Sequence, residues 1–344
     1  MYFSRSLKLL NIRTESSFLR AIVGVLAAWA IAFPSVAAPD PTPYLGYAEV
    51  DKFIDSMVDE HGFDRTSLKQ IFGAAKRKQS ILDAIARPAE KTKAWWEYRN
   101  IFIKNKRINQ GKAFLKKHRE LLERTEKKFG VPKEIIVAIL GVETRYGRYT
   151  GGYRVIDALS TLSFDYPPRQ KFFRQQLVEF LLLAREEKQN PLDLMGSYAG
   201  AMGYGQFMPS SYRAYAIDFD GDNKRDIWNN PADAIGSIAN YLSRHGWKPG
   251  EPIITRATTS GDQFEAIANK SLKPAHSVAK MKALGVLPVT SHDDETLASL
   301  VKLKNKQRYE YWMGFKNFYV ISRYNHSRLY SMAVFQLSQL VNQP

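Results

Sequence analysis

The chain has 344 residues and no cysteine, and it carries 50 Lys or Arg against 34 Asp or Glu, a formal net charge of +16. Without cysteine, the chain can form no disulfide bond, thiolate metal site, cysteine nucleophile or lipid-modified N-terminal cysteine. The excess of positive charge favours a polyanionic partner, either nucleic acid or an anionic cell envelope. The basic residues are scattered and no nucleic-acid-binding module is recognisable, so charge alone does not choose between these partners.

The N-terminus has the layout of a secretory signal. Basic residues precede an apolar run over residues 21–33, and small residues follow at Ser35 and Ala37. This run is short for a membrane span, so we expect residues 1–37 to be a signal peptide that is cleaved after Ala37. The cleaved protein would be exported to the periplasm and would have no stable transmembrane span. An uncleaved membrane anchor is the alternative.

Residues 38–130 begin with a proline-rich linker and then predict a helical region. From residue 49 to about residue 129, apolar side chains recur at the spacing of amphipathic helices. One helix begins at a WWEYR stretch. Aromatic side chains at helical spacing usually pack in a core, so we expect Trp95 or Trp96 there, while Tyr98 either joins the core or lines a groove.

The stretch VPKEIIVAILGVETRYG, residues 131–147, predicts a buried helix that carries one acid near its end. A proline suits the first turn, a terminal glycine is a natural stop, and the run between them is apolar on every side. Glu143 shares its helical face with isoleucine and leucine side chains. Partial desolvation raises the pKa of a carboxyl group, which suits a general acid. The alternative is a structural ion pair with Arg145 or Arg148.

A glycine-rich loop over residues 195–212 follows an amphipathic helix that begins near Arg169. Its glycines allow close backbone approach, and Ser197 and Gln206 offer hydrogen bonds. This mixture of small, polar and aromatic residues suits a sugar-binding wall, although a tight structural loop explains the glycines equally well.

Three aspartates, Asp218, Asp220 and Asp222, stand at the first, third and fifth positions of the next loop. This spacing supplies the hard oxygen ligands that calcium needs; Lys224 could add its backbone carbonyl and Asp233 could close the site. The match to an EF-hand loop is partial because the sixth position is not glycine and the twelfth is not glutamate. A solvated acidic turn is the alternative.

The pattern changes from helix to strand after residue 245. We interpret residues 246–316 as a small β-rich insertion between a catalytic core, residues 131–245, and a C-terminal strand and helix, residues 317–344. Short helical pieces are expected near Phe264 and Val278. The predicted strands are 253–258 and stretches within 297–304, 309–313 and 318–321.

Four ordered segments carry a resemblance to a known family: GVETRYG, SYAGAMGYGQFMPSSY, DFDGDNKRDIW and RYNHSRLY. Together they resemble the B-type lytic murein transglycosylases, and the likeness spans roughly residues 49–340. It implies a mainly α (α+β) fold with a goose-lysozyme-like helical core, a helical accessory region and the small β-rich insertion. It also implies cleavage of peptidoglycan between N-acetylmuramic acid and N-acetylglucosamine, leaving a 1,6-anhydro end.

The resemblance assigns roles by motif. It implies that Glu143 is the catalytic acid and base, that the aspartate loop holds a structural Ca²⁺, and that catalysis needs no cofactor. The paired arginines that the family often shows are replaced by Pro168 and Arg169. The implied glycan-binding residues are Tyr98, Arg169, Ser197, Gln206, Tyr241, Tyr324, Asn325 and Tyr330. The implied metal ligands are Asp218, Asp220, Asp222, Lys224 and Asp233.

Chemistry with a single carboxylate is the leading interpretation. Ordinary glycosidases use two carboxylates, and only Asp157 and Asp165 stand as candidates for a second one. A hydrolysing muramidase on the same fold and a non-catalytic envelope-binding protein are the alternatives. We expect a monomer that acts on peptidoglycan strands, with other cell-wall enzymes as further candidate partners. Export would make nucleic acid a poor partner.

Overall fold

The structure, a computed structural model, describes residues 43–86 and 93–343. The predicted signal peptide and its cleavage point after Ala37 lie outside these residues. The described residues all belong to one compact unit. Within the described ranges, no helix is both long enough and apolar enough to cross a membrane.

The N-terminal part is helical, as the apolar periodicity predicts. Local signals end and begin these helices: Gly62 closes the first one at φ 64°, and the Asp64 side chain accepts a hydrogen bond from the Ser67 N–H at the start of the second. The elements are α1 (Ala48–His61), α2 (Arg65–Ala74), α3 (Gln79–Ile85), α4 (Trp95–Phe102), α5 (Asn105–Lys117) and α6 (Arg119–Phe129).

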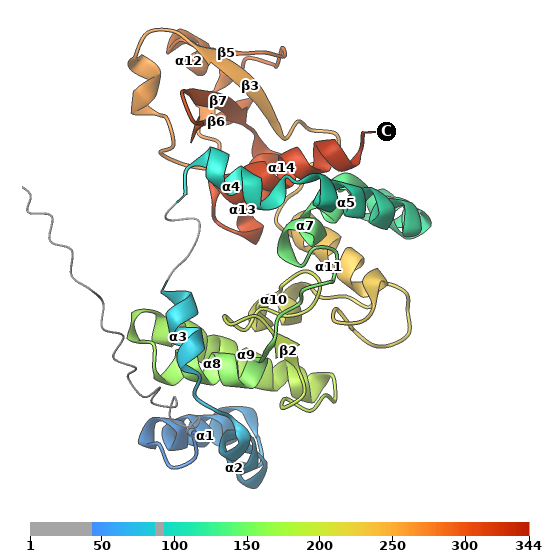
Figure 1. The fold of residues 1–344 in the computed structure, drawn as a ribbon, viewed down its shortest axis with the longest axis vertical. Helices are drawn as coiled ribbons and strands as arrows, with labels where there is room; N and C mark the ends of the chain where they lie inside the picture. Colours follow the sequence, from blue (N-terminus) through green and yellow to red (C-terminus); the bar gives the residue numbers. More distant parts are fainter. Residues whose placement is uncertain (1–42, 87–92, 344) are drawn as a thin grey trace, which may run out of the picture. The chain divides into compact units, whose positions relative to one another are not determined.

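The central part surrounds a helix, α7 (Lys133–Glu143), whose residues from Ile135 to Val142 are all buried. Helices α8 (Val155–Phe164) and α9 (Gln170–Glu186) pack side by side (Figure 1). A 3₁₀ turn, η2 (Pro167–Arg169), joins them. The two-residue strands β1 (Tyr153–Arg154) and β2 (Met195–Gly196) pair antiparallel, and α10 (Pro209–Tyr215) and α11 (Pro231–Arg244) complete this part.

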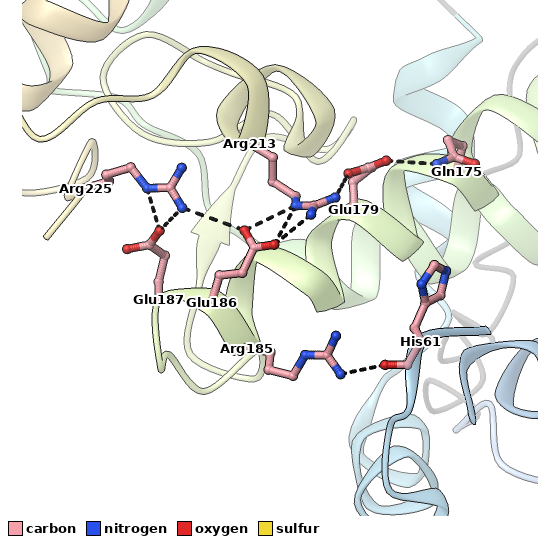
Figure 2. A network of polar contacts seen from close by, with 8 residues as sticks. All are labelled: His61, Gln175, Glu179, Arg185, Glu186, Glu187, Arg213 and Arg225. Carbon is pink, nitrogen blue, oxygen red and sulfur yellow. Dashed lines mark hydrogen bonds and ion pairs between the residues drawn. The ribbon is translucent and has the colours of Figure 1, made fainter. Parts of the chain in front are cut away.

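Arginine–glutamate pairs tie α9 to its neighbours (Figure 2). Arg213 on α10 bonds Glu179 and Glu186, the latter at 2.6 Å, and Arg225 in the loop before α11 donates through Nε to Glu187 at 2.7 Å. Arg185 donates to the His61 carbonyl at the end of α1, at 2.8 Å. One helix therefore anchors α1, α10 and the segment that follows the aspartate loop.

The β-rich part contains an antiparallel five-stranded sheet in the order β4-β6-β7-β3-β5. Strand β3 partly alternates between buried and exposed side chains, and Ala257 on its buried face joins a small apolar core around Met281 and Met313. Strand β6 is buried on both faces, because Leu300 lies in this core while Val301 and Leu303 lie in a second core. The strands are β3 (Ile254–Thr259), β4 (His276–Ser277), β5 (Val286–Pro288), β6 (Leu297–Lys304) and β7 (Tyr309–Gly314). The short helices are η3 (Gln263–Ala266) and α12 (Val278–Ala283), near the positions predicted.

The chain returns to helix in α13 (Lys316–Tyr324) and α14 (Arg328–Val341). The predicted strand at 318–321 is wrong, because this segment lies inside α13. Its apolar run is short and rich in aromatic and β-branched residues, and such a run does not distinguish a strand from a buried helix. Helix α14 packs against α7, α5 and α4, and α4 also contacts β6 (Figure 1).

Candidate active site

Glu143 is the last residue of α7, and the chain reverses immediately after it. Arg145, Tyr146 and Gly147 all have positive φ, at 54°, 63° and 82°. Two of these are not glycine, and such backbone is strained, so surrounding contacts must hold it. Thr144, 1% exposed, does so: its hydroxyl oxygen accepts the Gly147 N–H at 2.9 Å and donates to the Tyr204 carbonyl at 2.9 Å. The glutamate is thereby fixed at a partly exposed helix end.

Tyr330 contacts the carboxylate directly. Its hydroxyl donates to Glu143 Oε1 at 2.7 Å, and only 2% of the residue is exposed. The Ser327 side chain accepts the Tyr330 N–H and caps α14, which sets the direction of that helix. Burial and the nearby charge of Glu143 raise the pKa of Tyr330 well above its usual value. Tyr330 is therefore a neutral donor throughout the physiological pH range.

Aromatic residues from three elements form one cluster beside this pair. The Tyr324 ring lies parallel to that of Tyr330, with centroids 6.5 Å apart, and its hydroxyl donates to the Gly205 carbonyl at 2.5 Å. Burial is the main cause that raises the pKa of Tyr324, and the charge of Glu143 is the second. Tyr241 on α11 lies 4.9 Å from the Tyr324 ring, and its hydroxyl donates to the Arg323 carbonyl at 2.5 Å.

In the glycine-rich loop, the side chains of Ser197 and Gln206 form hydrogen bonds with backbone groups. The Ser197 hydroxyl oxygen accepts the N–H groups of Ala199 and Ala201 at 3.3 and 3.1 Å. Gln206, at φ 51°, donates both hydrogens of its amide to backbone carbonyls, those of Thr150 and Gly203, at 3.0 Å each. Its amide oxygen is therefore the group suited to a ligand. The loop is therefore a tight structural turn and at the same time a candidate for the sugar-binding wall.

A groove of about 1040 Å³ brings together Arg169, Tyr198 and Asn325. Arg169 is exposed and lies over the Phe172 ring at 4.2 Å. Asn325 ends α13 and is followed by the segment that leads to Tyr330. Tyr98 is different: it is 1% exposed and belongs to the core formed with α14 and the sheet, 5.1 Å from the Phe102 ring. The structure thus places Tyr98 in the core rather than on an open wall.

Both candidates for a second catalytic carboxylate, Asp157 and Asp165, bond to segments that flank the N-terminal helices. Asp157, 3% exposed, accepts from the Lys76 N–H and pairs with Arg154, each at 2.8 Å. Asp165 accepts from the Tyr44 hydroxyl at 2.5 Å and from Arg77 at 3.1 Å. These contacts are structural.

The aspartate loop gathers four carboxylates. One oxygen from each of Asp218, Asp220, Asp222 and Asp233 lies within 4.8 Å of the others. Asp233 is fully buried, and burial, together with the charges of Asp220 and Asp218, raises its pKa to about 6. Four acids so close repel one another unless a cation lies between them, so this set fits a hard divalent ion. At the sixth position Asn223 adopts φ 67°, the conformation that glycine usually supplies there.

Sequence reasoning missed Thr144 as the residue that holds the turn after Glu143. Its only local signal was its place directly after the acid, because its partner Tyr204 lies 60 residues further on.

The match to known proteins is extensive. A family model described as Transglycosylase SLT domain matches residues 46–339. The chain belongs to this family. It is 45% identical over 299 residues to membrane-bound lytic murein transglycosylase B of Escherichia coli K12, covering 84% of this chain and 81% of that one.

Two solved structures extend this likeness to the fold. Soluble lytic transglycosylase SltB1 from Pseudomonas aeruginosa matches with a TM-score of 0.81 and 51% identity, over 85% of this chain and 98% of that one. The Escherichia coli lytic transglycosylase Slt35 in complex with calcium matches with a TM-score of 0.80 and 44% identity, over 86% and 93%. The predicted family and the mainly helical fold class are confirmed, and the chain is a lytic murein transglycosylase.

Proposed function

We propose that Glu143 is the general acid and base that cleaves the glycan strand of peptidoglycan and closes the 1,6-anhydro ring. The observation that carries this assignment is its position: a carboxylate at the end of a buried helix, hydrogen-bonded by the neutral hydroxyl of Tyr330. Arg145, one of the two arginines considered as a structural ion-pair partner of Glu143, donates a hydrogen bond to the Gln110 side chain at 2.8 Å.

The reaction needs one protein carboxyl group. Protonated Glu143 donates its proton to the oxygen that leaves C1 of N-acetylmuramic acid, while the N-acetyl oxygen of the same sugar stabilises the developing positive charge at C1. The resulting carboxylate takes the proton of the C6 hydroxyl, and O6 forms a bond to C1. Glu143 returns to its protonated state, and no water enters the product.

The surroundings of Glu143 support this cycle. The Tyr330 hydrogen bond stabilises the carboxylate present between the two proton transfers. The groove with Arg169 and Asn325 would hold the strand, and Tyr324, Tyr241, Ser197 and Gln206 would shape its wall. Tyr98 would act from the core by positioning the neighbouring ring of Tyr330. Intramolecular attack by O6 gains from high effective molarity, so a well-held ring outruns water.

The aspartate loop would bind Ca²⁺ as a structural ion through Asp218, Asp220, Asp222 and Asp233, with Lys224 adding its backbone carbonyl. The ion would neutralise the four acids and hold the loop before α11. The proposed setting is the periplasm, reached through a cleaved signal peptide at residues 1–37, with the enzyme acting as a monomer on glycan strands.

The test is product analysis by mass spectrometry in ¹⁸O-labelled water. Purified peptidoglycan digested by the protein should give anhydromuramic ends without label at C1. Labelled reducing ends as the main product would identify a hydrolase and contradict the one-carboxylate cycle.

A Glu143→Gln variant tests the residue itself. It should fold, bind glycan and lose turnover by at least about 10²–10⁴-fold, because an amide cannot deliver the proton. Near-normal activity of this variant would remove Glu143 from the mechanism.

A further inference from the structure

The turn after Glu143 is held by a helix that the proposed chemistry does not use. Arg145 and Tyr146, the two residues of this turn that have positive φ without being glycine, both bond to α5. The Arg145 Nε–H donates to the Gln110 side chain at 2.8 Å. The Tyr146 hydroxyl donates to the Arg107 carbonyl at 2.9 Å. Helix α5 therefore holds the two backbone positions where the strain of the turn lies.

Two glycines form a slot for the Tyr146 side chain. Gly111 on α5 and Gly141 on α7 are both buried, and a Cβ atom at either position would collide with the tyrosine. At Gly141 this atom would lie 2.7 Å from the hydroxyl oxygen and 2.8 Å from Cζ. At Gly111 it would overlap the hydroxyl oxygen and lie 2.6 Å from Val341 Cγ1 on α14. The missing side chains are what allow α5 and α7 to close on the tyrosine.

Tyr146 fills this slot with both its side chain and its backbone fixed. Only 8% of the residue is exposed, and its ring stacks on that of Phe114 on α5, with centroids 5.8 Å apart. Its N–H donates to the Leu140 carbonyl at 2.9 Å, in the last turn of α7. One residue thus ties α5 to the end of the helix that carries Glu143.

Helix α5 lies outside residues 131–245, which we predicted as the catalytic core. Its contacts nevertheless reach the segment directly after the acid. If the Tyr146 ring were displaced, the end of α7 would move with it, and Glu143 would no longer lie 2.7 Å from the Tyr330 hydroxyl. Hydrogen bonds weaken steeply when they are misaligned, and a displacement of about 1 Å in a catalytic group can cost about 10²-fold in rate.

We propose that Tyr146 is a positioning residue for Glu143. In this proposal α5 and the two glycines hold the tyrosine ring, and the ring fixes the strained turn that presents the carboxylate to the sugar. Tyr146 touches no substrate and acts only through the backbone that it shares with the acid. The inference rests on the proposed role of Glu143 and deepens it.

The test is a Gly111→Ala variant, with Gly285→Ala as its control. A methyl group at Gly111 would push on the Tyr146 hydroxyl, whereas one at Gly285, which follows α12 in the β-rich insertion, would collide with the Ser260 carbonyl. Both changes should lower the melting temperature. Activity on purified peptidoglycan is measured well below the melting temperatures of both variants, so that only folded protein is compared.

Gly111→Ala should lower kcat about 10–10²-fold at nearly unchanged KM, because the acid is misplaced while the groove is intact. The alkaline limb of its pH–rate profile should move upward, since the hydrogen bond from Tyr330 to Glu143 is weakened. Gly285→Ala should keep kcat, KM and the pH profile. Equal effects of the two changes, or a loss of stability with normal kcat in Gly111→Ala, would overturn the proposal.

A compensating change tests the slot itself. Tyr146→Phe alone breaks the hydrogen bond to the Arg107 carbonyl and should lower kcat. In the Gly111→Ala background, the same change removes the oxygen that the new methyl group overlaps, so it should raise kcat. A further fall in kcat in the double variant would contradict the slot.

Gln110→Leu covers the case in which Gly111→Ala does not fold. It removes the acceptor of the Arg145 Nε–H and should lower kcat about threefold to tenfold with KM unchanged. Normal kcat in this variant would show that α5 does not hold the turn. Glu143→Gln reports the proposed function separately: if it is inactive while the α5 variants behave like the control, only the positioning role fails.

Discussion

Replacing Tyr330 by phenylalanine removes one hydrogen bond from Glu143 and keeps the aromatic ring that stacks beside Tyr324. A hydrogen bond to a charged group is worth about 1.5–3 kcal/mol. Because Glu143 is partly exposed, we take the low end of this range, which is about tenfold in a rate constant. In the proposed mechanism, donation of the proton creates charge on Glu143, so the lost bond is one that strengthens in the transition state.

Tyr330→Phe should therefore lower kcat about tenfold and shift the pH–rate profile. The tyrosine favours the charged carboxylate, so its loss raises the pKa of the acid and moves the alkaline limb of the profile upward by about one pH unit. The assay is kcat against pH from about pH 4 to 9 on purified peptidoglycan, followed by release of anhydromuropeptides.

The matched control is Tyr44→Phe, which removes another buried tyrosine hydroxyl from another carboxylate, that of Asp165, at 2.5 Å. It should cost stability and leave the pH profile in place. A Tyr330→Phe enzyme with normal kcat and an unshifted alkaline limb would refute the assignment of Tyr330 as the donor that stabilises the charge.

Three further predictions concern the surroundings. Millimolar calcium should stabilise the fold by about 2.7 kcal/mol at a hundredfold excess over Kd and so raise the melting temperature. Asp222→Ala should blunt this rise, and identical melting curves with calcium and with chelator would mean a solvated acidic loop. Gly205→Ala should lower activity with the fold intact, because its new Cβ would lie 2.8 Å from the Tyr324 hydroxyl; unchanged kcat would show that this ring can move freely. Burial lowers the pKa of His245, so folding loses stability as the pH falls below about 6.5. His245→Phe should flatten that slope in urea unfolding at pH 5.5 and 7.5, and an unchanged slope would assign it to other groups.

Local patterns in the sequence were enough for much of this fold. The buried helix α7, the acid at its end and the aspartate spacing are readable because each lies within a few turns of chain. The prediction of a strand at 318–321 is wrong for the opposite reason. Its strand-like composition was overruled by packing in the interior, where Phe318 and Ile321 are fully buried.

The partners of Glu143 could not be read from the residues alone. Tyr330 lies 187 residues away in the sequence, and it was named only because the chain resembles a family. Thr144 was adjacent to the acid and still went unnoticed, since its role depends on the Tyr204 carbonyl in a different loop. Tyr98 shows the same limit, because whether its ring faces core or groove depends on α14 and the sheet.

These long-range contacts have a consequence for how the site forms. Glu143 needs the turn that Thr144 secures against the glycine-rich loop, and it needs Tyr330 from the last helix. The loop is in turn joined to the segment after the aspartates, because the Tyr204 N–H donates to the Ile227 carbonyl at 2.9 Å. Closing such contacts costs chain entropy that only the assembled core repays. The geometry of the proposed active site is thus a property of the whole folded unit. Two hydrogen bonds, from Thr144 to Tyr204 and from Tyr204 to Ile227, link the turn after Glu143 to the segment that follows the proposed calcium loop.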